Sequence, residues 1–128
     1  MNPEIWGPHA WMFLHTITLN YPENPSYQDK QTHRLFFESL QDVIPCPKCK
    51  QHYKQNLIDY PIQLNSKKEL ISWLINIHNQ VNLKNNKRKY SYEEVNHIYN
   101  DLYNSVNYTN IYLFITLLIC IFIYVYNK

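Results

Sequence analysis

The sequence predicts an all-α protein: a four-helix bundle with a short fifth helix, followed by a C-terminal transmembrane helix. Apolar residues recur with helical spacing, and no long segment alternates with the period of a strand. Two S-x-x-E capping boxes, at residues 66–69 and 91–94, mark helix starts. The 128 residues contain one glycine, Gly7, which is few for a sheet protein with tight hairpins. Short loops between the helices favour a small antiparallel bundle.

Composition and charge narrow the class of protein. Hydrophobic residues make up 45% of the chain and aromatic residues 16%, which is enough to build a core, so a disordered chain is excluded. The length fits one domain. The net charge of +2 is too small to indicate nucleic-acid binding, and no nucleic-acid partner is expected.

Apolar spacing defines the first two helices. The first is expected from about Pro3 to Leu19, ending before the Tyr21-Pro22 pair, because a residue before proline disfavours helix. The second is expected over residues 26–43. The side chains that we expect to face the core are Ala10, Phe13, Leu14 and Ile17 in the first helix, and Leu35, Phe36 and Leu40 in the second.

The next three helices have clearer start signals. The third begins at the C-x-x-C segment, residues 46–49, and ends near Ile58, before Pro61. The fourth begins at the first capping box and runs toward Asn82, and a short fifth helix runs from the second box to about Asn104. The expected core face of the fourth helix comprises Leu70, Trp73, Leu74, Ile77 and Val81.

The last segment of the chain is apolar on all sides. Residues 111–126 read IYLFITLLICIFIYVY, with Thr116 the one polar residue that is not aromatic. As a helix this run spans about 24 Å, somewhat less than a hydrocarbon core of about 30 Å. We expect a membrane anchor over residues 108–128 behind a soluble domain over residues 1–107; a buried core helix is the alternative. No signal peptide is visible, so the soluble domain is expected on the cytosolic side.

The segment Pro45-Cys46-Pro47-Lys48-Cys49 holds two of the three cysteines. Cysteines at i and i+3 share a helix face and can bond to each other, and the free N–H groups of a first turn favour a thiolate. Zinc is the alternative, with His52 as third ligand and a fourth from His33, His78 or His97. An idle pair is the third possibility, so spacing alone leaves redox, metal and structural interpretations open.

Two other segments combine aromatic, histidine and amide side chains. In the first, Trp11 and His15 are four residues apart and share a helix face. In the second, residues 78–82 read HNQVN, a face that suits an aromatic heterocycle, and the lysines that follow suit a diphosphate. Each segment also has a plain structural explanation: a core tryptophan beside a histidine, and a helix end whose cations oppose the dipole.

Together these segments resemble the FAD-linked sulfhydryl oxidases of the Erv/ALR family. The motifs are W-G-x-x-x-W-x-x-L-H from Trp6, then Y-P from Tyr21, P-C-x-x-C from Pro45 and H-N-x-V-N from His78. Their order and spacing fit from Trp6 to Tyr92. The resemblance implies a helical bundle that binds FAD, a homodimer, and oxidation of protein thiols to disulfides with reduction of O2 to H2O2.

The resemblance also implies a role for individual residues. Cys49 would be the flavin-proximal cysteine, forming a charge-transfer pair with the isoalloxazine, and Cys46 the outer cysteine that exchanges with a substrate dithiol. The implied FAD-binding residues are Gly7, Trp11, His15 and Tyr21 around the flavin, His78, Asn79, Val81 and Asn82 on the adenine and ribose side, and Lys84, Lys87 and Tyr90 near the phosphates.

The sequence departs from many family members in having no additional shuttle cysteines. Its third cysteine, Cys120, lies in the apolar run and is interpreted as an apolar filler. Cys46 is therefore expected to accept electrons directly from protein thiols or from a thioredoxin-like carrier. This short form looks like the members encoded by large cytoplasmic DNA viruses, which places the anchor in a virion or host membrane. A zinc-binding interaction module using Cys46, Cys49 and His52, and an adaptor without activity, are the rival interpretations.

Overall fold

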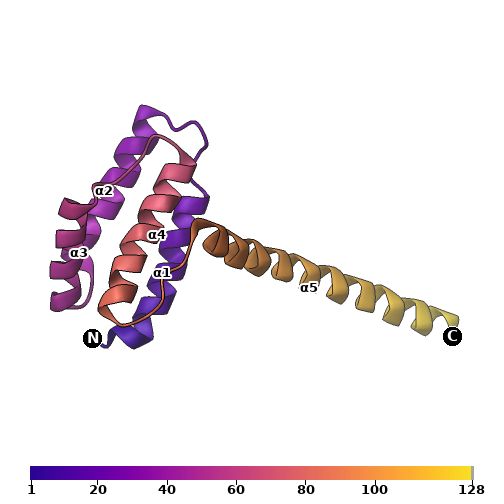
Figure 1. Ribbon diagram of the computed structural model, residues 1–128. Helices are drawn as coiled ribbons and strands as arrows, with labels where there is room; N and C mark the ends of the chain where they lie inside the picture. The colour runs from indigo at the N-terminus through magenta and orange to yellow at the C-terminus, as the bar shows by residue number, and fades with distance from the viewer. Residues whose placement is uncertain (128) are drawn as a thin grey trace. The chain divides into compact units, whose positions relative to one another are not determined.

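The computed structural model describes residues 1–127, without the side chains of residues 106–109. All regular structure in this part of the chain is helical, which confirms the all-α prediction (Figure 1). The helices are α1 (Pro3–Leu19), α2 (Tyr27–Val43), α3 (Pro47–Asp59), α4 (Lys67–Lys84) and α5 (Tyr92–Tyr126). The chain forms two compact units, Met1–Tyr92 and the part that begins at Glu93.

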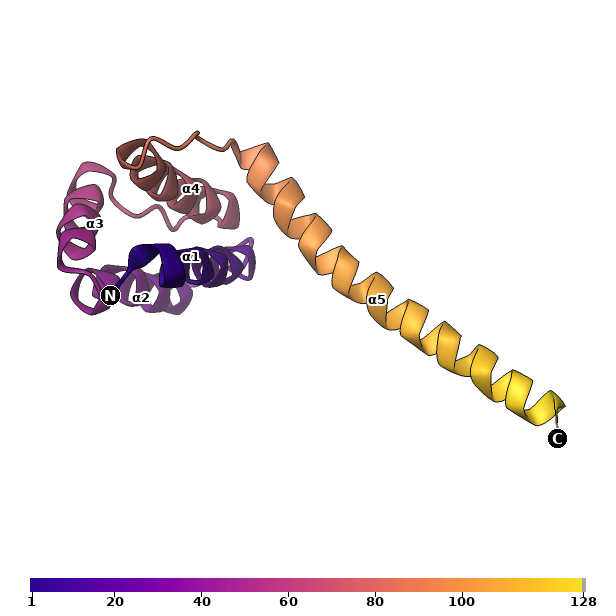
Figure 2. The same ribbon diagram turned by 90° about the horizontal axis from the view of Figure 1, so that it is seen from below.

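The first unit is a bundle of α1 to α4. Helix α1 packs against α4, α2 packs against α3, and α3 also contacts α4. Figures 1 and 2 show that α1 and α3 begin at the same end of this bundle, where α4 ends. This arrangement brings the C-x-x-C segment to the end of the bundle that also holds the N-terminus and the end of the H-N-x-V-N segment.

Side-chain caps explain where these helices begin. Asn2, Ser26, Cys46 and Ser66 are the N-caps of α1 to α4, and each accepts a hydrogen bond from a backbone N–H of the first turn. At Ser66 the predicted box is modified, because the carboxylate of Glu69 accepts from the backbone N–H of Asn65 at 3.1 Å. A complete capping box occurs at Ser26, where the sequence motifs did not predict one.

The core of the bundle lies between α4 and the buried faces of its neighbours. Leu70, Trp73, Leu74 and Ile77 are buried as predicted, whereas Val81 is only partly buried. The prediction was wrong for Phe13 and Leu35, which are 61% and 67% exposed. On α2 the fully buried side chain is Phe37; two positions along a helix amount to about 200° of rotation, so burial of Phe37 turns Leu35 to solvent.

Helix α5 differs from the prediction. The expected short helix and the apolar segment form one continuous helix of 35 residues, because neither proline nor glycine interrupts residues 92–126. By length and composition this helix could cross a membrane, with a mean hydropathy of 2.1 in its most apolar window. The expected boundary between residues 107 and 108 falls within this helix, among residues whose side chains are not described, and stays a prediction.

Candidate active site

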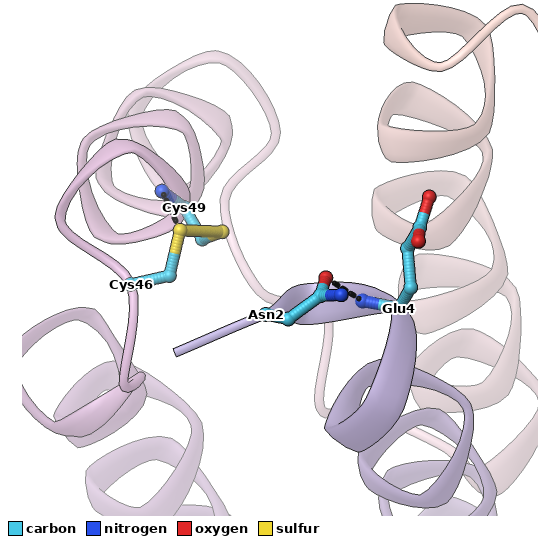
Figure 3. The surroundings of a disulfide bond; sticks show 4 residues. All are labelled: Asn2, Glu4, Cys46 and Cys49. Carbon is cyan, nitrogen blue, oxygen red and sulfur yellow. Dashed lines mark hydrogen bonds between the residues drawn. A yellow bond between two sulfur atoms is a disulfide. The ribbon is translucent and has the colours of Figure 1, made fainter.

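The two cysteines of the C-x-x-C segment form a disulfide at the start of α3 (Figure 3). Cys46 is the N-cap residue, and Pro47 occupies the first turn, where its missing N–H costs no hydrogen bond. The backbone N–H of Cys49 donates to Sγ of Cys46 at 3.2 Å, and the two Cα atoms are 5.1 Å apart. The same N–H groups would stabilise a thiolate here after reduction, since a helix N-terminus favours negative charge.

Both cysteines are partly buried at the start of α3, beside a buried stripe and a lysine stripe of this helix. Cys49 begins the stripe that continues through Tyr53, which is 5% exposed, and Asn56, which is 3% exposed. Cys46 begins the stripe that continues at spacings of four residues through Lys50 and Lys54, and Lys54 is exposed. The disulfide therefore lies where the buried stripe and the lysine stripe of α3 meet.

Tyr53 lies one helical turn after Cys49 on α3. Its hydroxyl donates to the backbone carbonyl of Phe37 at 2.9 Å, and burial raises the pKa of this phenol above its usual range, with Glu38 contributing. The sequence motifs did not single out Tyr53. Its position four residues after Cys49 is the signal that could have identified it, because residues at that spacing lie on the same helix face.

A compact group of rings joins α1 to α4. The rings of Trp11 and His78 are stacked, with centroids 3.9 Å apart and planes inclined by 7°. Nε2 of His15 and Nδ1 of His78 are 3.2 Å apart, so one ring donates a hydrogen bond to the other. The structure thus brings His78 to Trp11 and His15, two predicted site residues that lie more than sixty positions before it in the sequence.

Both histidines in this group are neutral at physiological pH. Burial lowers the pKa of His15 from 6.5 to about 4, and the neighbouring His78 contributes in the same direction. Burial, and then Lys87, lower the pKa of His78 to about 4. A neutral pair is the state in which one ring nitrogen donates and the other accepts, as the distance between them requires.

The segment after α4 is held by Asn79. Its side-chain amide donates to the carbonyl of Tyr90 at 2.8 Å, and its oxygen accepts from the N–H of Tyr90 at 2.9 Å. Arg88 lies 4.0 Å from the ring centroid of Tyr90, within cation–π distance. These contacts fix both ends of the basic segment that contains Lys84 and Lys87, whose side chains are exposed.

The remaining predicted site residues have distinct environments. Asn82 is 6% exposed, and its amide nitrogen has no hydrogen-bond partner among the described residues. A Cβ atom added to Gly7 would meet no other atom within 4 Å, so the space beside this residue is open. Tyr21 is buried in the core, where its hydroxyl donates to the carbonyl of Leu64 at 3.0 Å. Contact of Tyr21 with a cofactor therefore stays a prediction.

The zinc interpretation is not supported. A site using Cys46, Cys49 and His52 needs both thiolates as ligands, but the two sulfur atoms are bonded to each other. Among the side chains that the structure describes, no group of three histidine, cysteine or acidic residues is placed to hold a metal ion.

A helical bundle with a C-x-x-C disulfide at a helix start defines a class: helical thiol–disulfide exchange proteins. Comparison with known sequences identifies the family within this class. The sequence model of the Erv1/Alr family matches residues 8–100, so this chain belongs to that family, and the predicted resemblance is confirmed.

Relatives in this family come from viruses, plants and yeast. A probable FAD-linked sulfhydryl oxidase of Acanthamoeba polyphaga mimivirus is 41% identical over 97 residues, which cover 73% of this chain and 68% of the relative. An FAD-linked sulfhydryl oxidase of African swine fever virus is 28% identical over 104 residues, covering 80% and 87%. The chain spans about half the length of the plant relatives it matches.

The fold also matches solved structures. The crystal structure of the FAD binding domain of Erv1 from Saccharomyces cerevisiae superposes with a TM-score of 0.69 at 30% identity, covering 71% of this chain and 87% of that one. The bundle described above therefore has the Erv1 fold.

Proposed function

We propose that this chain is an FAD-dependent sulfhydryl oxidase, which forms disulfide bonds in protein substrates and passes the electrons to O2, giving H2O2. The observation that carries the proposal is the partly exposed Cys46–Cys49 disulfide at the start of α3. It occurs in a family whose relatives are named FAD-linked sulfhydryl oxidases.

The residues of the bundle fit an FAD cofactor. Trp11 and His78 offer flat, neutral rings, and the buried amide nitrogen of Asn82 needs a hydrogen-bond acceptor that the described residues do not supply. Gly7, His15 and Tyr21 would complete the flavin side. Asn79 and Val81 would complete the adenine side, with Lys84, Lys87 and Tyr90 near the phosphates. When bound, FAD supplies the two-electron acceptor and the reaction with O2.

Thiol exchange on this chain begins at Cys46. A substrate thiolate attacks Sγ of Cys46, the Cys46–Cys49 bond breaks, and Cys49 leaves as a thiolate that the first turn of α3 stabilises. The second substrate thiol then attacks the mixed disulfide and releases the oxidised substrate. Both protein sulfurs are now reduced, and the substrate has lost two electrons and two protons.

The two cysteines would have separate roles in this reaction. The family resemblance implies that Cys46 is the outer cysteine that meets the substrate, and Cys46 lies four residues before Lys50. The resemblance implies that Cys49 is the flavin-proximal cysteine, and Cys49 lies one helical turn before the buried Tyr53. The electron donor at Cys46 is a protein thiol substrate or a thioredoxin-like carrier.

The test of this function is H2O2 production with a dithiol. Purified protein should contain flavin, and dithiothreitol should drive O2 consumption with stoichiometric H2O2. Cys49→Ala should abolish turnover while retaining FAD, whereas the matched control Cys120→Ala should keep full activity, because Cys120 lies in the apolar part of α5. Colourless protein, or full activity in Cys49→Ala, would contradict the proposal.

The apolar part of α5 fits a membrane anchor. Side chains from Leu113 to Val125 are exposed, and an exposed apolar helix of this size needs an apolar environment. The bundle would then remain on the cytosolic side of a virion or host membrane. Extraction of the full chain from membranes by detergent but not by alkaline carbonate would agree with the anchor, and release by carbonate would contradict it.

A homodimer would use the exposed apolar side chains of α1 and α2. Met12 is 46% exposed, Phe13 61% and Leu35 67%, and the rings of Phe13 and Phe36 contact each other across the two helices. Sedimentation of the detergent-solubilised chain should give a dimer, and Phe13→Glu should give a monomer. A dimer that survives Phe13→Glu would place the interface elsewhere.

A further inference from the structure

Two segments of the chain carry cations and no carboxylates. Between Asp42 and Asp59 the charged side chains are Lys48, Lys50 and Lys54. Between Glu69 and Glu93 they are Lys84, Lys87, Arg88 and Lys89. These seven residues are more than half of the twelve lysines and arginines in the chain, so positive charge is concentrated in two short segments.

The fold brings both segments to the end of the bundle that holds the redox disulfide. Helix α3 begins there with the cysteine pair, and α4 ends there (Figure 1). His52 is affected by cations from both segments. Burial is the main cause that lowers its pKa, and Lys84 of one segment and Lys48 of the other lower it further. Glu4 is the exposed carboxylate that Figure 3 draws with the disulfide, and it belongs to α1, outside the lysine stripe of α3.

The lysines of α3 are not explained by ion pairs or by the helix dipole. Lys48 and Lys50 lie in the first turns, where the helix dipole opposes cations. Within the described residues, Lys48, Lys50 and Lys54 have no carboxylate at ion-pair distance. Lys50 and Lys54 instead continue the stripe that begins at Cys46, so they lie where a bound substrate would extend along α3.

We propose that this lysine stripe selects the substrate: Lys50 and Lys54 bind acidic residues next to the reactive thiol of the protein that Cys46 oxidises. The proposal rests on the proposed oxidase function and names its substrate class, a protein dithiol in an acidic segment. Charge complementarity of this kind acts mainly on the rate of encounter and weakens with salt. Lys84 and Lys87 are left out of the stripe, because the oxidase function already places them near FAD.

The test compares two dithiol peptides that differ only in the charge beside their cysteines, one with glutamates and one with lysines. With the full chain in neutral detergent at low salt, kcat/KM should favour the acidic peptide by roughly tenfold, the range of electrostatic steering. The preference should shrink in high salt and in Lys50→Gln/Lys54→Gln. The control Lys30→Gln/Lys67→Gln removes the same charge from the first turns of α2 and α4 and should keep the preference.

Dithiothreitol, which is uncharged, separates the two proposals. All variants should oxidise it equally, and absence of this activity in the wild type would refute the oxidase function and the substrate class together. Oxidation of dithiothreitol with equal rates for both peptides, or an unchanged preference in Lys50→Gln/Lys54→Gln, would overturn the substrate class alone. The substrate class would also be overturned if Lys50→Gln/Lys54→Gln changed turnover only when phosphatidylserine was added to the micelles. The lysine stripe would then bind anionic lipid.

Discussion

Acid should destabilise this protein through its buried histidine pair. His15 and His78 are neutral in the folded state, and burial is the main reason that the pKa of each falls from 6.5 to about 4. In the unfolded chain both rings would be hydrated and would titrate near 6.5. Unfolding therefore takes up protons below that pH, so the stabilisation is complete above about pH 6.5 and is lost as the pH falls toward about 4.

The two pKa values set the size of this effect. At about pH 5 an unfolded histidine is almost fully protonated, whereas a folded one with a pKa of about 4 is mostly neutral. The linkage relation then gives a loss of about 2 kcal/mol in the free energy of unfolding for one histidine between about pH 8 and pH 5. For the pair the expected loss is about 2 to 4 kcal/mol, because protonation of one ring opposes protonation of the other.

Urea denaturation of the FAD-saturated protein at the two pH values measures this loss. His15→Asn and His78→Asn should each reduce the acid-induced loss by up to about 2 kcal/mol, since each removes one of the two groups. His9→Gln is the matched control, because His9 is exposed on the same helix as His15. Equal stability of the wild type at both pH values, or an undiminished loss in both asparagine variants, would refute the reasoning.

Two further predictions concern hydrogen bonds that support the site. Tyr53→Phe leaves the carbonyl of Phe37 without its partner and should lower the free energy of unfolding by about 1 to 2 kcal/mol, measured by urea denaturation; an unchanged midpoint would show that this bond does not stabilise α3. Asn79→Ala removes both hydrogen bonds to Tyr90, so trypsin should cleave the basic segment after α4 faster and FAD should bind more weakly. Unchanged cleavage together with normal FAD affinity would show that Asn79 does not hold this segment.

Much of the bundle could be predicted because local signals agreed with the tertiary fold. The bounds of α1 are those expected from its apolar spacing and the proline that follows it. The core face of α2 could not be predicted, because Leu35, Phe36 and Phe37 are adjacent and all apolar. Only the packing of α2 against α3 buries Phe37 and leaves Leu35 exposed.

The contacts among the predicted site residues could not be derived from the sequence. Sequence motifs identified Trp11 and His78, yet their stacking depends on the packing of α1 against α4. The family resemblance assigned Asn79 to the adenine side, and the structure adds bonds to Tyr90 that hold the loop. The length of α5 was missed because a change of composition near residue 108 was interpreted as a boundary, although no residue there breaks a helix.

In the proposed mechanism, Cys46 and Cys49 carry electrons from a thiol substrate to FAD. Anaerobic mixing of the FAD-loaded protein with excess dithiol tests it directly, because reduction bleaches the visible absorption of the flavin. The wild type should bleach rapidly, and Cys49→Ser should stay yellow on the same timescale with Cys46 as a free thiol, because this variant has no disulfide for the dithiol to attack. Rapid bleaching in Cys49→Ser, or a wild-type flavin that the dithiol does not reduce, would contradict the account.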